Sequence, residues 1–142
     1  MREKIIALAT NIAPPWYTPI TEELLRKITR QIVKTFRPEK VILFGSYANG
    51  KPTIHSDIDL LVITRAMAQQ SVFARHRAVS KLFPQRRFSL DVLVRTPSEV
   101  KARLSKGDRF MQEIIEGGRI LYEQRHPGRM GLRSRNGLQK RS

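Results

Sequence analysis

The chain has 142 residues, of which 40% are hydrophobic, which is enough for the core of one modest domain and too little for two. The absence of Cys excludes a disulfide framework, and the cytoplasm is the expected compartment. The formal net charge of +15 predicts attraction to an acidic ligand or partner, such as a nucleotide or a nucleic acid, without choosing between them.

The two ends of the chain differ in composition from its middle. Residues 1–20 contain three prolines and one apolar run, Ile5–Ala9, which is too short for a signal-peptide core or a membrane span. Residues 125–142 carry six basic side chains and no acid, with Pro and Gly between them, and we expect this basic tail to be disordered. We therefore predict an N-terminal extension (1–20), one domain (21–124) and a basic tail (125–142), with no targeting segment and no membrane contact.

The first predicted helix begins after Thr21, a suitable N-cap, and ends before Pro38. Glu22 and Glu23 in its first turn favour the helix dipole. Its apolar residues recur at helical spacing and predict a stripe that packs on a sheet: Leu24, Leu25, Ile28, Ile32, Val33 and Phe36.

A short apolar strand, Val41–Phe44, is predicted next, and Gly45 and Ser46 follow it directly. Such a turn can direct backbone N–H groups and one hydroxyl toward an anion, because glycine permits unusual dihedral angles and adds no side-chain bulk. The turn is therefore a candidate phosphate site.

The next predicted strand is Asp57–Ile63. Side chains alternate along a strand, so Asp57 and Asp59 share one face while Ile58, Leu60 and Val62 take the other. Two carboxylates so close would repel each other unless a cation lies between them or one keeps its proton. With no Cys and no clustered His, oxygen ligands favour Mg²⁺ or Mn²⁺ over zinc.

A helix over Ala66–Phe83 and a strand over Phe88–Val94 are predicted after it. Three basic residues of the helix, Arg75, Arg77 and Lys81, are candidates for a phosphate or nucleic-acid contact, although plain exposure to solvent is the preferred interpretation. In the strand, Asp91 shares a face with Ser89 and Leu93, and an acid among apolar neighbours needs a partner, which a nearby metal ion would supply.

Three short elements complete the predicted domain. One helix begins near Thr96 and a second is capped by Asp108 and stopped by Gly117 and Gly118. Residues 120–122 then predict a final strand at an edge of the sheet.

The order of these motifs resembles the minimal nucleotidyltransferases of the DNA polymerase beta superfamily. The matching residues are Gly45-Ser46, then Ser56-Asp57-Ile58-Asp59 after a loop of about ten residues, and Asp91 on a later strand. The resemblance implies an α/β (α+β) nucleotidyltransferase fold, a small mixed sheet with helices packed on it. Asn49 departs from the pattern, because many relatives carry Arg there, so no phosphate contact is assigned to it.

The resemblance also implies roles for the matching residues. Asp57 and Asp59 would hold the metal ion bound to a nucleoside triphosphate, and all three acids, Asp91 included, the ion that activates an acceptor hydroxyl. Gly45 and Ser46 would contact phosphates, and Ser56 would orient Asp57 or touch phosphate. Two Mg²⁺ ions about 4 Å apart can stabilise both ends of such a displacement.

The preferred functional hypothesis is transfer of AMP from ATP to a hydroxyl. By the same resemblance, the acceptor would lie on a helical HEPN-type partner protein in a toxin–antitoxin pair. One alternative makes RNA the acceptor, held through the basic tail and helix faces. Another is a module that binds nucleic acid without catalysis. The three carboxylates argue against it, because they are costly to keep and a site without catalysis does not need them.

Overall fold

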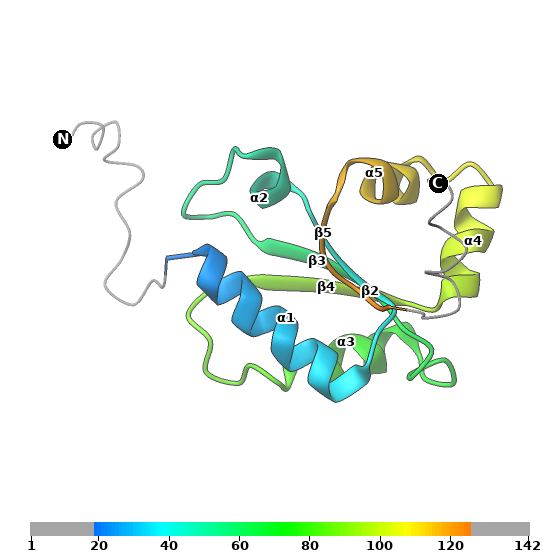
Figure 1. Ribbon diagram of the computed structural model, residues 1–142, viewed down its shortest axis with the longest axis horizontal. Coiled ribbons are helices and arrows are strands. Elements are labelled where there is room, and N and C mark those ends of the chain that lie inside the picture. Colours follow the sequence, from blue (N-terminus) through cyan, green and yellow to red (C-terminus); the bar gives the residue numbers. More distant parts are fainter. Residues whose placement is uncertain (1–18, 126–142) are drawn as a thin grey trace.

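The computed structural model describes residues 19–125 and contains a four-stranded sheet with helices on both sides (Figure 1). The strands are β2 (Lys40–Phe44), β3 (Ile58–Ile63), β4 (Leu90–Arg95) and β5 (Arg119–Glu123), in the spatial order β4-β3-β2-β5. β2 runs antiparallel to β3 and β5, whereas β3 and β4 are parallel. The predicted small mixed sheet is confirmed, including the final strand at its edge.

Helix α1 (Glu22–Phe36) forms as the sequence predicts. The Thr21 hydroxyl oxygen accepts a hydrogen bond from the Leu24 N–H at 3.1 Å, which caps the helix. The helix ends at Arg37, which adopts a left-handed conformation with φ 47° just before Pro38. Its buried apolar residues, Leu25, Ile28 and Ile32, pack on the sheet.

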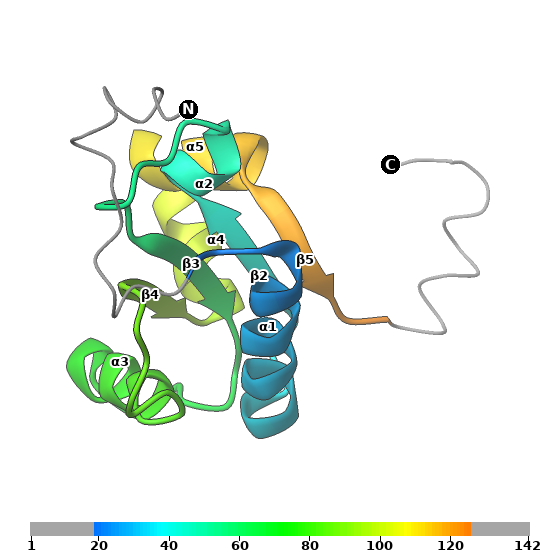
Figure 2. The same ribbon diagram turned by 90° about the vertical axis from the view of Figure 1, so that its left-hand side faces the viewer.

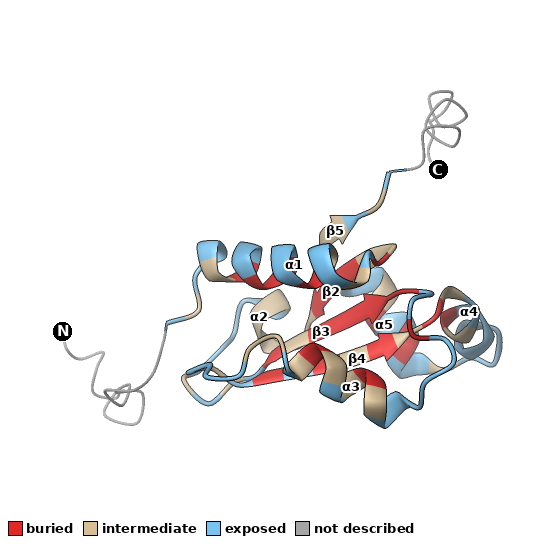
Figure 3. Cartoon of the chain, turned by 90° about the horizontal axis from the view of Figure 1, so that it is seen from below, coloured by how far each residue is buried: buried red, intermediate tan, exposed pale blue. Residues whose placement is uncertain are grey.

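The sheet separates two apolar cores. Helices α1 and α3 (Val72–Ser80) cover one face, and α4 (Pro97–Ser105) and α5 (Arg109–Gly117) cover the other (Figures 1 and 3). Leu60 and Val62 belong to the first core and Leu61 to the second, as the alternation of strand side chains requires. Because both faces of β3 are buried, its residues form a continuous apolar run.

Helix α3 is shorter than predicted, because the sequence indicates a helix over Ala66–Phe83 and the structure forms one only over Val72–Ser80. The Ser71 hydroxyl accepts a hydrogen bond from the Ala74 N–H at 3.1 Å and so starts the helix there. Val72 at the start of the helix is 50% exposed, whereas Val79 is fully buried. A nearby serine cap therefore replaces the first turns of the predicted helix.

Arg75 contradicts the prediction of a solvent-facing side chain, because it is only 3% exposed. Its guanidinium donates to both carboxylate oxygens of Glu99, at 2.7 and 3.0 Å. It also donates to backbone carbonyl oxygens of the segment before α3 and of β4, those of Met67, Ala68, Gln70 and Val94. Arg75 is therefore a structural link between α3, β4 and α4.

The last two helices begin where the sequence predicts, and the Asp108 cap is confirmed. Thr96 caps α4 in a capping box with Glu99, and the Asp108 carboxylate accepts from the Met111 N–H at 2.9 Å to cap α5. Helix α5 ends at Gly117, and Gly118 leads into β5. The predicted N-terminal extension and basic tail lie almost wholly outside the described residues. No helix within residues 19–125 is long and apolar enough to cross a bilayer.

Candidate active site

Gly45 places a sharp bend between β2 and a short helix. It has φ 75° and ψ −156°, a backbone conformation that is essentially restricted to glycine. The chain then enters α2 (Ser46–Asn49), a helical turn in which the Ala48 and Asn49 N–H groups donate to the Gly45 carbonyl oxygen. The sequence predicted the turn at Gly45 and Ser46 but not that a helical turn follows it.

The bend at Gly45 lies directly against Asp59. A Cβ atom added to Gly45 would lie 2.2 Å from Oδ2 and 3.1 Å from Cγ of the Asp59 side chain, far too close for a real contact. The absence of a side chain at Gly45 is therefore what lets the Asp59 carboxylate occupy its position beside the bend.

Asp59 and Asp91 are partners in the parallel register of β3 and β4. Paired side chains of neighbouring strands project on the same face, so both acids lie on the side of the sheet that carries Leu61 and Leu93. The structure thus places Asp91 in the same layer as Asp59, next to it across the strand pair.

Asp57 precedes β3 and lies two residues before Asp59. Its Oδ1 atom accepts a short hydrogen bond from the Ser89 hydroxyl. Asp57 and Asp91 are exposed, whereas Asp59 is half-buried. Ser89 is a partner that the sequence analysis did not assign, although its position two residues before Asp91 in an alternating strand already placed it on the same face.

The three acids interact electrostatically at this end of the sheet. Burial first, and then the negative charges of Asp91 and Asp57, together raise the pKa of Asp59 to about 6. Asp59 is therefore harder to ionise than an ordinary aspartate.

These side chains suit a hard divalent cation in their chemistry, since all three are carboxylates and they repel one another. They are not gathered around one point, however, because no group of three His, Cys, Asp or Glu side chains in the described part of the chain is arranged to hold a metal ion. The Asp57 carboxylate accepts its hydrogen bond from the Ser89 hydroxyl instead. A cation would have to draw Asp57 toward the Asp59–Asp91 pair.

Ser56 lies in the loop before β3 and fastens that loop. Its Oγ atom accepts a hydrogen bond from the Thr53 N–H at 2.8 Å. Ser56 also lines a groove of about 400 Å³ together with Asp57, Ser89 and two exposed arginines, Arg86 and Arg87. Two basic side chains therefore line the same groove as Asp57.

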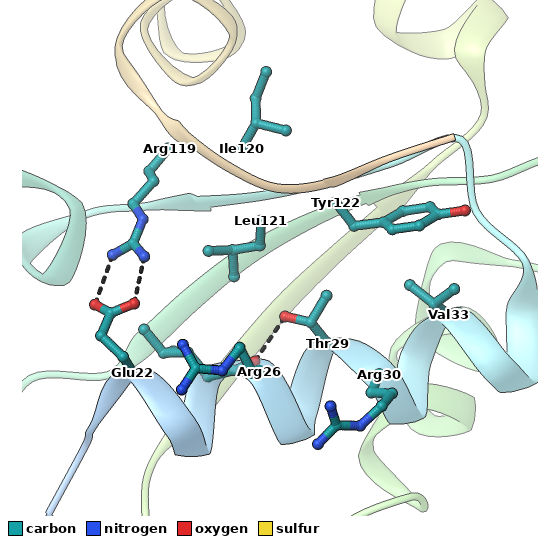
Figure 4. A pocket seen from close by; sticks show the side chains of 10 residues that line it. Glu22, Arg26, Thr29, Arg30, Val33, Arg119, Ile120, Leu121 and Tyr122 are labelled. Atoms are coloured by element: carbon teal, nitrogen blue, oxygen red, sulfur yellow. Dashed lines mark hydrogen bonds and ion pairs between the residues drawn. The ribbon is translucent and has the colours of Figure 1, made fainter. Parts of the chain in front are cut away.

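A separate groove of about 440 Å³ lies between α1 and β5 and contains none of the predicted site residues (Figure 4). Arg119 closes one end of it through a paired contact with the Glu22 carboxylate. Arg26 and Arg30 project from α1 along its side. This groove is distinct from the acidic cluster.

Gly45→Ala is expected to lower any activity of the acidic cluster by about 10²-fold, because displacement of a reacting group by about 1 Å has that effect. The added methyl must push the Asp59 carboxylate away, and the positive φ adds about 1–3 kcal/mol of strain. Gly107→Ala is the control, since Gly107 has φ 77° but open space around it. Equal activity in the two variants, measured on folded protein, would show that activity does not depend on the close approach of Gly45 and Asp59.

The chain resembles known proteins in both sequence and structure. The family described as "Nucleotidyltransferase domain" matches residues 23–122. No curated protein matches the chain. Among solved structures, a candidate nucleotidyltransferase from Sulfolobus solfataricus is 25% identical with a TM-score of 0.52, covering 72% of this chain and 79% of that one.

Two other solved structures have lower TM-scores. The toxin–antitoxin pair MntA-HpeT gives 18% identity and a TM-score of 0.47, covering 84% of this chain and 94% of that one. BolA1 from Arabidopsis thaliana gives 16% identity and a TM-score of 0.43, covering 51% and 90%. Neither is similar enough to support an argument about function. The family match spans most of the chain, and the protein belongs to the nucleotidyltransferase domain family.

Proposed function

We propose that the protein transfers a nucleotide, AMP from ATP, to an acceptor hydroxyl, with Asp57, Asp59 and Asp91 as its catalytic residues. The observation that carries this proposal is the position of Asp59. Its side chain lies against the glycine bend, and its register partner on the neighbouring strand β4 is Asp91. A phosphate chain at the bend and an acceptor near Asp91 would therefore meet at Asp59.

The bend supplies the phosphate side of the proposed site. Gly45 keeps the approach free of side-chain bulk, and the Ser46 hydroxyl at the start of α2 has no hydrogen-bond partner within residues 19–125. Gly45 and Ser46 would receive the β and γ phosphates, with Ser56 holding the loop that carries Asp57.

The acids supply the reactive side. Asp57 and Asp59 would hold one divalent ion and all three acids a second, Mg²⁺ or Mn²⁺; when bound, the ions would offset the negative charge that builds up on the phosphate oxygens. The acceptor oxygen forms a bond to the α phosphorus, the bond to pyrophosphate breaks, and the hydroxyl proton leaves to a base. Asp91 is exposed and is the proposed base, since it lies on the open side of Asp59.

The proposed acceptor is a hydroxyl of a partner protein in the cytoplasm, of HEPN type in a toxin–antitoxin pair. This part of the proposal rests on the resemblance of the Gly-Ser and Asp-x-Asp motifs to the minimal nucleotidyltransferases. The protein would then act as the antitoxin by modifying its partner.

RNA is the second candidate acceptor, and one observation favours it. Arg86 and Arg87 line the groove that contains Asp57, and neither forms an ion pair with an acid of the described residues. Two guanidinium groups that have no acidic partner within residues 19–125 could bind a phosphate backbone there, and such contacts weaken steeply with salt.

The test is pyrophosphate release by the full chain with Mg²⁺ and ATP, in the presence of either a cell lysate or purified RNA. We expect release with the lysate, and intact-mass analysis of its proteins should then find an added AMP on one of them. Labelling of RNA that disappears in Arg86→Ala/Arg87→Ala would instead support the second candidate. No release with any acceptor or nucleotide would reject catalysis and leave a binding module.

A further inference from the structure

A third groove adjoins the glycine bend. It encloses about 200 Å³ between α2 and α5 and includes Gly45 itself in its wall. Figure 2 shows α2 beside α5 at this end of β2, and residues of both line the groove. Pockets for whole drug-sized ligands are roughly 300–1,000 Å³, so this groove suits one part of a nucleotide.

The connectivity of a nucleotide decides which part that would be. The nucleoside is bonded to the α phosphate, which the proposed reaction places beside Asp59 and therefore against Gly45. The β and γ phosphates would continue from it toward Ser46. Helix α5 packs on the sheet face that carries Asp59, so the nucleoside would extend across Gly45 into the groove between α2 and α5.

The apolar walls of this groove suit a flat ring. Phe44 and Phe110 are 5.7 Å apart in an edge-to-face arrangement, and both line the groove. Phe110 remains 53% exposed, so part of its ring is open to a ligand. A nucleobase covering it would remove that apolar surface from water.

The polar groups of the groove indicate which base. Glu113 and Asn49 both line it, both are exposed, and neither side chain has a hydrogen-bond or ion-pair partner within residues 19–125. An ionised carboxylate only accepts hydrogen bonds, so Glu113 would repel a phosphate and favour an amino group. Asn49 offers both a donor and an acceptor, the combination that pairs with N7 and the N6 amino group of adenine.

We infer that the groove between α2 and α5 is the nucleobase site of the proposed nucleotidyltransferase, and that Glu113 and Asn49 select adenine through its exocyclic amino group. This inference rests on the proposed function, whose phosphate end at Gly45 it shares. It also gives a role to Asn49, the residue that departs from the pattern of the family.

The test compares the binding of ATP and inosine triphosphate, which differ at the position where adenine carries its amino group. With Mg²⁺, the full chain should bind ATP about tenfold or more tightly, because a carbonyl facing Glu113 would leave the carboxylate unpaired. In Glu113→Gln the preference should fall to about twofold or less, since the new amide can donate to that carbonyl. Binding of inorganic tripolyphosphate should be unchanged.

The matched control is Glu116→Gln, which removes the same charge one turn later on α5 at a residue that does not line the groove. It should keep the full preference for ATP. Equal binding of ATP and inosine triphosphate by the unmodified protein, or an unchanged preference in Glu113→Gln, would overturn the inference. If tripolyphosphate still binds and pyrophosphate is still released, the proposed function survives that result; if no triphosphate binds at all, both fail.

Discussion

Asp59→Asn is expected to reduce pyrophosphate release by at least about 10²–10³-fold, the effect of removing one strong electrostatic contact from a transition state. The substitution keeps the size of the side chain and its place beside Gly45 but removes the charge that lies between Asp57 and Asp91. Glu116→Gln, an equal loss of charge far along α5, should retain activity. Comparable release from both variants would reject the assignment of the acidic cluster.

The same substitution should stabilise the protein in the absence of divalent ions. Folding raises the pKa of Asp59 from an ordinary value near 3.8 to about 6, so ionisation of this group opposes folding. The penalty is absent below the unfolded pKa and fully present above pH 6. Because Asp59 is partly exposed, solvent screening limits the gain to on the order of 1 kcal/mol.

Thermal unfolding at two pH values tests this sign. At pH 7.5 without metal, Asp59→Asn should unfold at a higher temperature than the unmodified protein, and near pH 4 the difference should vanish. Adding Mg²⁺ should then raise the unfolding temperature of the unmodified protein more than that of the variant. A variant that is less stable at pH 7.5 would show that ionisation of the Asp59 carboxylate does not oppose folding.

The acidic cluster could be predicted from the sequence because its geometry is local. The alternation of side chains along each strand fixes which residues share a face with Asp59, and an apolar run on the other face sets the register. Gly45 was recognised for the same reason, since a glycine directly after a strand indicates a bend. The contact between Gly45 and Asp59 follows from the pairing of β2 with β3, which brings Phe44 opposite Asp59.

Other features depend on contacts between distant segments and could not be predicted in this way. The groove between α2 and α5 joins residues near 45 and residues near 115, and nothing local to either indicates the other. The sequence predicts a helix over residues 66–83, but the Ser71 cap and the binding of the Met67 and Gln70 carbonyl groups by Arg75 delay its start to Val72. Charge alone gave the same prediction for Arg75 and Arg77, which the fold treats in opposite ways.

Arg75→Ala is expected to destabilise the protein by about 1–3 kcal/mol, the usual cost of leaving buried polar groups unsatisfied, since the Glu99 side chain is itself 39% exposed. The variant removes the Arg75 donor from the Glu99 carboxylate and from four backbone carbonyl oxygens. Small domains have only about 5–15 kcal/mol of stability in total, so a large share would be lost. Urea unfolding followed by circular dichroism measures the difference.

Arg77→Ala is the matched control for this prediction. It lies on the same helix, is exposed, and sits 5.1 Å from the centre of the Phe73 ring, a contact of about 0.5–1 kcal/mol. Arg75→Lys should recover little, because an ammonium group cannot make the planar pair with both Glu99 oxygens. Similar destabilisation by the two alanine variants would show that the Arg75 network carries no special stability.

The pH dependence separates the ion pair from the loss of packing. The hydrogen bonds from Arg75 lower the pKa of Glu99 to about 2, so the ionised pair stabilises the fold above the unfolded pKa near 4.5, and this contribution is lost as the pH falls toward 2. The unmodified protein should therefore lose more stability than Arg75→Ala between pH 5 and pH 2.5. Parallel losses in the two proteins would mean that Arg75 acts through its packing and backbone contacts, with Glu99 contributing nothing.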